Sequence, residues 1–189
     1  MKALLMRSTA LGTCAAALLV GVAATASAAP QRLPSYQQWQ SDVTAAIKPA
    51  TPWLEQRVGQ GGSKLAIVLD IDNTSLESEY HEGAPNKPVR AVATWAAQHG
   101  VAVLFATGRK ESGRSTTERQ LTAAGYQIDG LCMKNSHDSS NSATKQRCRK
   151  EYTSAGYTIT ANIGNRSTDF EGANYEKGFK LPDYDGQLS

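Results

Sequence analysis

The chain has 189 residues, of which 40% are hydrophobic, and this length leaves room for one domain with a proper core and little else. It carries 20 basic and 17 acidic residues, a formal net charge of +3. No basic run is interleaved with aromatic residues, so the sequence argues against a nucleic acid polymer as the main partner.

Residues 1–28 have the pattern of a secretory signal peptide. Lys2 and Arg7 make the start basic, an apolar stretch follows at 11–24, and Ala26–Ala28 supply a small-residue cleavage site. The alternative is a retained membrane anchor, but a spanning helix needs about 20 apolar residues, more than this stretch offers. We therefore predict a secreted protein, extracellular or in the cell envelope, without a stable membrane anchor. Cleavage would leave 18 basic and 17 acidic residues, a nearly neutral chain.

Beyond this leader the chain contains two cysteines, Cys132 and Cys148. An even pair in an exported chain makes a disulfide plausible. The alternative is a pair of buried thiols, and the spacing is not that of a zinc site. A disulfide Cys132–Cys148 is therefore the favoured expectation.

Residues 29–63 are predicted to form a helical extension that belongs to one domain with the core at 64–189. In its first part, apolar residues recur at helical spacing, at Tyr36, Trp39, Val43 and Ile47. This pattern predicts an amphipathic helix that ends at Pro49. A second, short helix is expected to begin at Thr51 and Pro52 and to end before Gly59.

Residues 65–69 form a continuous apolar run, which favours a strand buried on both faces of a parallel sheet. Asp70 and Asp72 follow at once, at the carboxyl end of this strand, where open α/β sheets collect their ligands. An isolated Asp-x-Asp is as consistent with a solvated turn as with a functional site. Residues elsewhere in the sequence are therefore needed to distinguish the two.

Helices and strands alternate through the remainder of the chain. The expected elements are a helix over about 88–99, a strand over 101–106, a helix from a capping box at Ser115 and Glu118 to Gly125, a strand over 126–132, a helix that holds Lys145 and Arg149 and ends at Gly156, and a strand over 157–163. Three helix-glycine-strand junctions are typical of right-handed crossovers in a parallel sheet. The predicted fold class is α/β, a three-layer, doubly wound, Rossmann-like parallel sheet.

No insertion in the sequence is long enough for a large cap domain. We therefore expect the N-terminal helices or a partner to cover the site, and an open site favours broad specificity.

Polar residues follow three of the four predicted strands. Besides the two aspartates they are Thr107, Gly108 and Arg109 after the second strand, and Asn165 and Asp169 after the fourth; Lys145 near a helix start faces the same edge. A hydroxyl, a lysine and several carboxylates at one edge can hold a phosphate and a divalent cation together.

These residues resemble motifs one to four, in order, of the haloacid-dehalogenase-like (HAD-like) hydrolase superfamily. The motifs lie at 70–74, at 107–109, at Lys145 and at 164–169. The sequence is most similar to the secreted acid phosphatase branch, which includes plant acid phosphatases and bacterial class B and C acid phosphatases. The resemblance covers the chain from about Tyr36 onward.

The resemblance implies that Asp70 is the nucleophile and forms an aspartyl-phosphate. Asp72 would protonate the leaving alkoxide and later deprotonate the attacking water. Because two neighbouring carboxylates push their proton affinities apart, we expect Asp70 to be ionised while Asp72 is protonated, with an optimum on the acid side of neutrality.

The same resemblance implies a phosphate site and a magnesium site. Phosphate would be held by Thr107, the Gly108 amide, Lys145 and, as one of two alternatives, Arg109; the other alternative for Arg109 is an exposed salt bridge. Mg²⁺ would be held by Asp70, the Asp72 carbonyl, Asn165 and Asp169. The family usually has aspartate in place of Asn165, and the missing charge is expected to weaken the affinity for the metal.

The implied function is that of a secreted, magnesium-dependent acid phosphatase acting on small phosphorylated metabolites. A dehalogenase needs neither the acid at Asp72 nor magnesium, and a transport ATPase needs membrane helices. The remaining alternative is a non-catalytic storage or binding protein on the same fold, against which the presence of both Asp70 and Asp72 argues.

Overall fold

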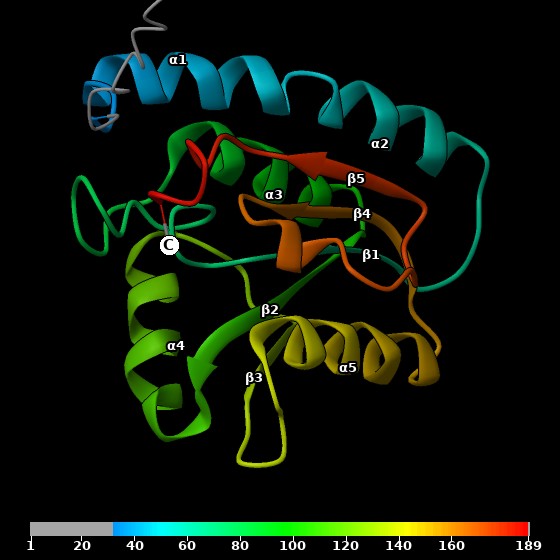
Figure 1. Cartoon of the computed structure of the whole chain (residues 1–189). Coiled ribbons are helices and arrows are strands. Elements are labelled where there is room, and N and C mark those ends of the chain that lie inside the picture. Colours follow the sequence, from blue (N-terminus) through cyan, green and yellow to red (C-terminus); the bar gives the residue numbers. More distant parts are fainter. Residues whose placement is uncertain (1–31, 189) are drawn as a thin grey trace, which may run out of the picture. The chain divides into compact units, whose positions relative to one another are not determined.

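A five-stranded parallel sheet forms the centre of the molecule in a computed structural model that describes residues 32–188 (Figure 1). The strand order is β3-β2-β1-β4-β5. The strands are β1 (Leu65–Leu69), β2 (Ala102–Lys110), β3 (Gly130–Lys134), β4 (Thr158–Gly164) and β5 (Lys177–Lys180). The predicted α/β class and parallel sheet are confirmed, whereas the predicted signal peptide at 1–28 lies outside the described residues.

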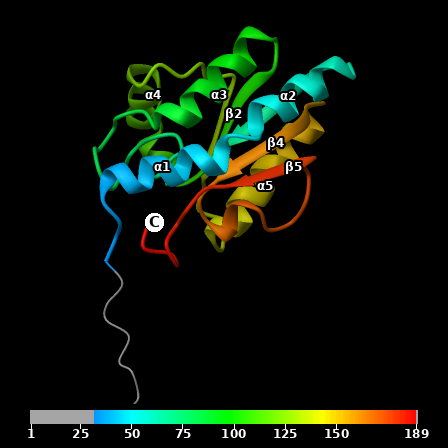
Figure 2. The same cartoon turned by 90° about the horizontal axis from the view of Figure 1, so that it is seen from above.

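Helices cover both faces of the sheet. They are α1 (Tyr36–Ile47), α2 (Ala50–Gly59), α3 (Lys87–Gln98), α4 (Arg114–Ala123) and α5 (Asn141–Ser154), with short 3₁₀ turns η1 (Glu111–Gly113) and η2 (Ser167–Asp169). Figure 1 shows α1 and α2 along one side of the sheet and α5 along the other, and Figure 2 shows α3 beside α1 and α2. Within residues 32–188 no helix has both the length and the apolar character needed to cross a membrane.

The residues of β1 alternate between two cores. Leu65, Ile67 and Leu69 belong to the larger core under α1, α2 and α3, while Ala66 and Val68 belong to a smaller core that includes Cys148 of α5. All five residues of β1 are buried. A central strand that is covered on both faces explains why its sequence is a continuous apolar run rather than an alternating one.

Three details of the expected elements are wrong. The third strand is β3 at 130–134, later than expected, because Tyr126 packs edge-on against Phe105 and donates its hydroxyl to the Ser75 carbonyl instead of joining the sheet. Helix α4 begins at Arg114 after η1, with no side-chain cap, so Ser115 lies inside the helix. The edge strand β5 was not predicted, because it is only four residues long with Phe179 as its one buried side chain.

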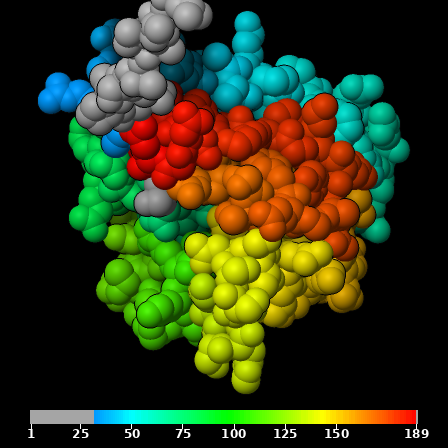
Figure 3. All heavy atoms as spheres, viewed as in Figure 1, coloured from blue at the N-terminus to red at the C-terminus, as the bar shows by residue number. Residues whose placement is uncertain are grey.

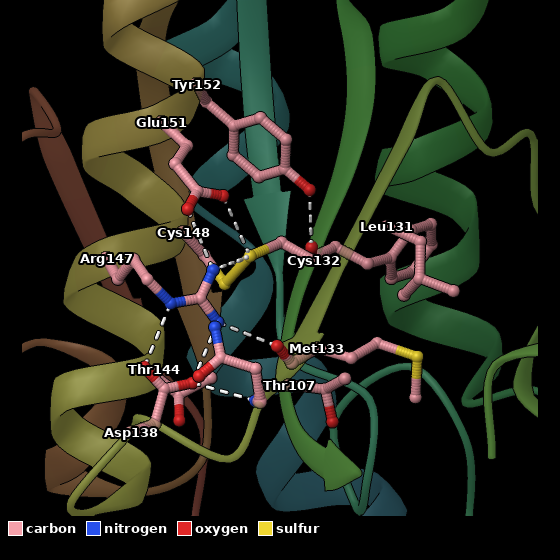
Figure 4. Close-up of a disulfide and its surroundings, with 12 residues drawn as sticks. Thr107, Leu131, Cys132, Met133, Asp138, Thr144, Arg147, Cys148, Glu151 and Tyr152 are labelled. Carbon is pink, nitrogen blue, oxygen red and sulfur yellow. Dashed lines mark hydrogen bonds and ion pairs between the residues drawn. A yellow bond between two sulfur atoms is a disulfide. The ribbon is translucent and has the colours of Figure 1, made fainter. Parts of the chain in front are cut away.

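The disulfide Cys132–Cys148 is present and joins β3 to α5, with the two Cα atoms 5.6 Å apart (Figure 4). Arg147, next to it on α5, pairs with Asp138 at 2.8 Å and donates to the Met133 carbonyl at 2.8 Å. These contacts hold α5 against the end of β3. Lys145 is about one turn before Cys148 on the same helix, so these contacts also help to position the part of α5 that carries Lys145.

Candidate active site

Asp70 follows β1 and lies in a turn whose backbone is tied to the sheet. Its amide donates to the Ile163 carbonyl of β4 at 2.9 Å, and its carbonyl accepts from the Ser75 hydroxyl at 2.6 Å. Asn73 has a φ of 52°, a left-handed conformation that asparagine tolerates better than most residues. The turn therefore brings the Thr74 hydroxyl back to Asp70 Oδ2 at 3.1 Å.

Lys145 of α5 lies between two buried carboxylates. Its Nζ is 2.8 Å from Asp70 Oδ1 and also pairs with Asp169 Oδ1. Burial lowers the pKa of Lys145, but the charges of Asp70 and Asp169 outweigh this and raise it. Burial, and next the charge of Asp169, raises the pKa of Asp70, while Lys145 opposes that rise. Lys145 supplies one positive charge against the two negative charges of Asp70 and Asp169, so a further cation bound beside them would be stabilised electrostatically.

Asp72 is paired with Arg109 rather than left open. The guanidinium Nε and Nη2 donate to the two carboxylate oxygens at 2.9 and 2.7 Å, and the Ser78 hydroxyl donates at 2.6 Å. Burial raises the pKa of Asp72, but the hydrogen bonds from Arg109 and Ser78 dominate and lower it. In the protein without ligand the expected pKa order is therefore reversed: the pKa of Asp70 is raised and that of Asp72 is lowered.

Thr107 and Gly108 lie at the end of β2, beside the start of α5. Thr107 is fully buried, and its Oγ1 accepts from the Arg109 amide at 3.1 Å. A Cβ at position 108 would lie 2.8 Å from Cγ of Asn141, so the absence of a side chain there lets α5 approach β2.

Asn165 is fully buried at the end of β4 with both ends of its amide engaged. Its Nδ2 donates to the Leu188 carbonyl at 2.9 Å, and its Oδ1 lies 3.4 Å from the Thr74 hydroxyl. Because Thr74 also contacts Asp70 Oδ2, the Asp70 and Asn165 oxygens converge on one point.

Asp169 is held close to the backbone of the segment that it follows. Its Oδ2 accepts from the Arg166 amide at 2.8 Å, and a Cβ at Gly164 would overlap its carboxylate. Both carboxylate oxygens of Asp169 are thus engaged by protein groups, one by Arg166 and the other by Lys145.

These residues line a cavity of about 280 Å³ at the carboxyl edge of the sheet. Its lining is Asp70, Asp72, Gly108, Asn141, Lys145, Asn165, Arg166 and Thr168. Asp70, Asp72, Gly108, Lys145 and Asn165 were expected from the sequence. Of the other expected residues, Arg109 pairs with Asp72, Asp169 pairs with Lys145, and Thr107 precedes Gly108 in the chain and accepts from the Arg109 amide.

The helices α1 and α2 contribute no residue to this lining. Instead, Trp39 of α1 stacks on Tyr80 with ring centroids 4.8 Å apart, and Tyr36 donates to Glu77 at 2.9 Å. The N-terminal helices therefore hold the segment that carries Ser78 beside Asp72, rather than covering the site.

Sequence reasoning missed four residues at the site. Asn141, Arg166 and Thr168 line the cavity, and Ser78 contacts Asp72. Asn141 could have been predicted from the sequence, because it precedes Lys145 by four residues and therefore lies on the same face of the helix. The positions of Ser78, Arg166 and Thr168 depend on loop conformations that periodicity does not report.

The donor set fits a hard, oxygen-preferring cation. Asp70 and Asn165 offer a carboxylate and an amide oxygen that converge, and the Asp72 carbonyl is nearby in sequence. Among residues 32–188 no group of three or more His, Cys, Asp and Glu side chains is placed to hold a metal. A cation here would therefore need amide and carbonyl oxygens as well as carboxylates, as Mg²⁺ tolerates.

The fold and the polar cluster at its sheet edge define a class of proteins, the HAD-like hydrolases. Residues 82–187 match the family described as "HAD superfamily, subfamily IIIB (Acid phosphatase)", and this match spans more than half of the chain. The chain therefore belongs to this acid phosphatase family, whose members are phosphomonoesterases. Asp70 and Asp72 lie before the matched residues, so the family match does not assign them a role.

Solved structures with a similar fold include the same class of enzyme. The class C acid phosphatase from Bacillus anthracis is 16% identical, with a TM-score of 0.65, and the match covers 79% of this chain and 80% of that one. The same enzyme with tungstate bound has 15% identity, the same coverage and a TM-score of 0.61. A chain of the Pnkp1/Rnl/Hen1 complex is 22% identical, with a TM-score of 0.55, over 63% of this chain and 45% of that one. No curated protein matches the chain.

Proposed function

We propose that this protein is a secreted, magnesium-dependent acid phosphatase that hydrolyses small phosphate monoesters through an aspartyl-phosphate on Asp70. The observation that carries the proposal is the buried Asp70 carboxylate, which lines the cavity with Lys145 on one oxygen and Thr74 on the other. A carboxylate fixed in this way is positioned for attack and has little freedom to lose.

In the first step an Asp70 oxygen attacks phosphorus and the ester bond to the leaving group breaks. Lys145 neutralises charge on Asp70 and on the phosphoryl oxygens, while the Thr107 hydroxyl and the Gly108 amide donate to those oxygens. Asp72 gives its proton to the leaving alkoxide. Asp72 then accepts a proton from water, which attacks phosphorus and returns Asp70 as a free carboxylate together with inorganic phosphate.

The oxygen donors described above would hold Mg²⁺ through Asp70, the Asp72 carbonyl and Asn165. Asp169 was expected to be a direct ligand, but unlike Asp70 and Asn165 it does not line the cavity, so we assign it to orienting Lys145 and the Arg166 amide. The bound ion would supply Lewis-acid stabilisation of the phosphoryl oxygens. It would also lower the pKa of Asp70 and so oppose the effect of burial.

The pairing of Asp72 with Arg109 supports an acid optimum. Asp72 must carry a proton to act as an acid, and Arg109 lowers its pKa. The protonated fraction therefore grows only as the pH falls, which favours activity on the acid side.

Hydrolysis of p-nitrophenyl phosphate by the mature chain tests the function directly. We expect turnover in the presence of Mg²⁺, loss on chelation with EDTA, and recovery when Mg²⁺ is added back. Tungstate should inhibit competitively, since it is a phosphate analogue that binds the related Bacillus anthracis enzyme. Turnover that is indifferent to EDTA would refute the metal requirement, and no turnover at any pH would refute the function.

At saturating Mg²⁺, which would lower the pKa of Asp70, replacement of Arg109 by methionine is expected to move the alkaline limb of the kcat/KM profile to higher pH. Arg109 stabilises ionised Asp72, so its removal raises the Asp72 pKa and lets Asp72 keep its proton at higher pH. The control is Arg119→Met, which removes an exposed arginine of α4 that bonds to Thr116. A limb that stays in place, or moves to lower pH, would show that Asp72 is not the acid.

A further inference from the structure

The segment Asp183–Leu188, here called the C-terminal segment, lies directly against the residues that follow β4. Figure 3 shows this segment, in red, packed on the orange region after β4. Leu188 is fully buried in the larger core, and the Leu188 amide donates to the Asp183 carbonyl at 3.1 Å. The segment therefore packs as a folded part of the domain.

The backbone of this segment adopts a conformation that is energetically unfavourable for residues other than glycine. Tyr184, Asp185 and Gly186 have φ values of 49°, 56° and 84°, all in the left-handed region. For tyrosine this conformation is rare, and it persists only when the surrounding contacts fix it. The Tyr184 hydroxyl donates to Asp42 of α1 at 2.7 Å, which is one such contact.

Arg166 holds the other end of the segment. Its Nη1 donates to the Gly186 carbonyl at 2.8 Å and to the Leu188 carbonyl at 3.3 Å. The Leu188 carbonyl thus accepts from two side chains, Arg166 and Asn165, and both line the cavity.

We propose that the C-terminal segment is a positioning element of the metal site, and that the Leu188 carbonyl orients Asn165 so that its amide oxygen faces the cation. A carbonyl accepts but cannot donate, so the Asn165 group that faces it has to be the NH₂. The oxygen of the amide is then turned toward Thr74 and Asp70. This inference rests on the proposed function, because the same site would bind Mg²⁺ for hydrolysis.

The proposal also explains why an amide suits position 165 better than a carboxylate does. A carboxylate at position 165 would place an oxygen where Nδ2 now lies, 2.9 Å from the Leu188 carbonyl oxygen. Two acceptors at that distance repel each other, and a buried acceptor without a donor is costly. The amide and the C-terminal segment therefore match each other, and either one changed alone should perturb the site.

A double-mutant cycle on Mg²⁺ affinity tests this, with the affinity measured by calorimetry on the free protein. The four proteins are the full mature chain, a chain that ends at Asp185, Asn165→Asp, and Asn165→Asp in the shortened chain. We expect shortening to weaken Mg²⁺ binding in the wild type. We expect Asn165→Asp to improve binding in the shortened chain by about tenfold more than in the full chain, because the opposing carbonyl is gone.

If Asn165→Asp changes Mg²⁺ affinity equally in the full and in the shortened chain, the proposal is overturned. A segment that only stabilises the fold would leave the effect of Asn165→Asp the same in both chains. If the shortened chain does not fold by circular dichroism, the same cycle is run with Arg166→Met in the full chain. That variant removes the guanidinium bonds to the Gly186 and Leu188 carbonyls and so loosens the Leu188 carbonyl, while it keeps the buried Leu188 side chain. Arg119→Met is its control.

The outcome also separates this inference from the proposed function. Coupling without hydrolysis of any phosphate ester supports the positioning role and refutes the phosphatase. Magnesium-dependent hydrolysis without coupling supports the phosphatase and refutes the positioning role.

Discussion

Asp70→Asn is expected to abolish turnover, with a loss of roughly 10⁴-fold or more in kcat, because an amide cannot act as the nucleophile. The fold should survive, because the substitution removes one of two carboxylates that face a single Lys145, and Asp169 remains as its partner. We therefore expect a thermal midpoint equal to or above that of the wild type, measured without metal.

The intermediate gives the sharper measurement. Wild-type protein mixed with ³²P-labelled substrate and quenched in acid should carry label on the peptide that contains Asp70, and Asp70→Asn should carry none. Glu118→Gln, which changes a carboxylate in an ion pair of α4, should be labelled like the wild type. Label on Asp70→Asn would assign the nucleophile to another residue.

Lys145→Met is expected to cause the largest combined loss, in stability and in activity. Without Nζ, Asp70 and Asp169 remain buried and unpaired, which costs about 3–5 kcal/mol in the free energy of unfolding. The phosphoryl charge also loses its neutralising partner, with a fall in kcat of about 10²-fold or more. Urea unfolding and p-nitrophenyl phosphate hydrolysis measure the two effects.

Two further variants separate the effects. Lys150→Met changes an exposed lysine of the same helix and should leave both stability and activity unchanged. Lys145→Met combined with Asp169→Asn removes one buried anion with the cation, so much of the stability should return while activity stays low. The deficit of Lys145→Met should also shrink as the pH falls from neutral toward about 4, because burial raises the pKa of Asp70 and its carboxylate accepts a proton in that window. A Lys145→Met midpoint equal to that of Lys150→Met would show that the three charges are not coupled.

The order of the helices and strands could be predicted from the sequence, because a strand that is buried on both faces has a continuous apolar run in its local sequence. The apolar run at 65–69 and the polar residues that follow it could be interpreted without any knowledge of contacts. The helix-glycine-strand junctions then fixed a parallel sheet, and a parallel sheet brings strand ends to one edge. The sequence therefore predicted one site that contains Asp70, Asp72, Gly108, Lys145 and Asn165.

The partners of these residues were decided only by the tertiary structure. Nothing in the sequence near Arg109 indicates that it pairs with Asp72, 37 residues away, in place of an exposed salt bridge or a phosphate contact. The same holds for Asn165 and the Leu188 carbonyl, and for Ser78 beside Asp72. A side chain takes the partner that loop conformation and packing bring within about 3 Å, and periodicity reports burial but not that distance. The sequence by itself therefore determined which residues gather at the sheet edge, while the packed chain decided their charge state and orientation.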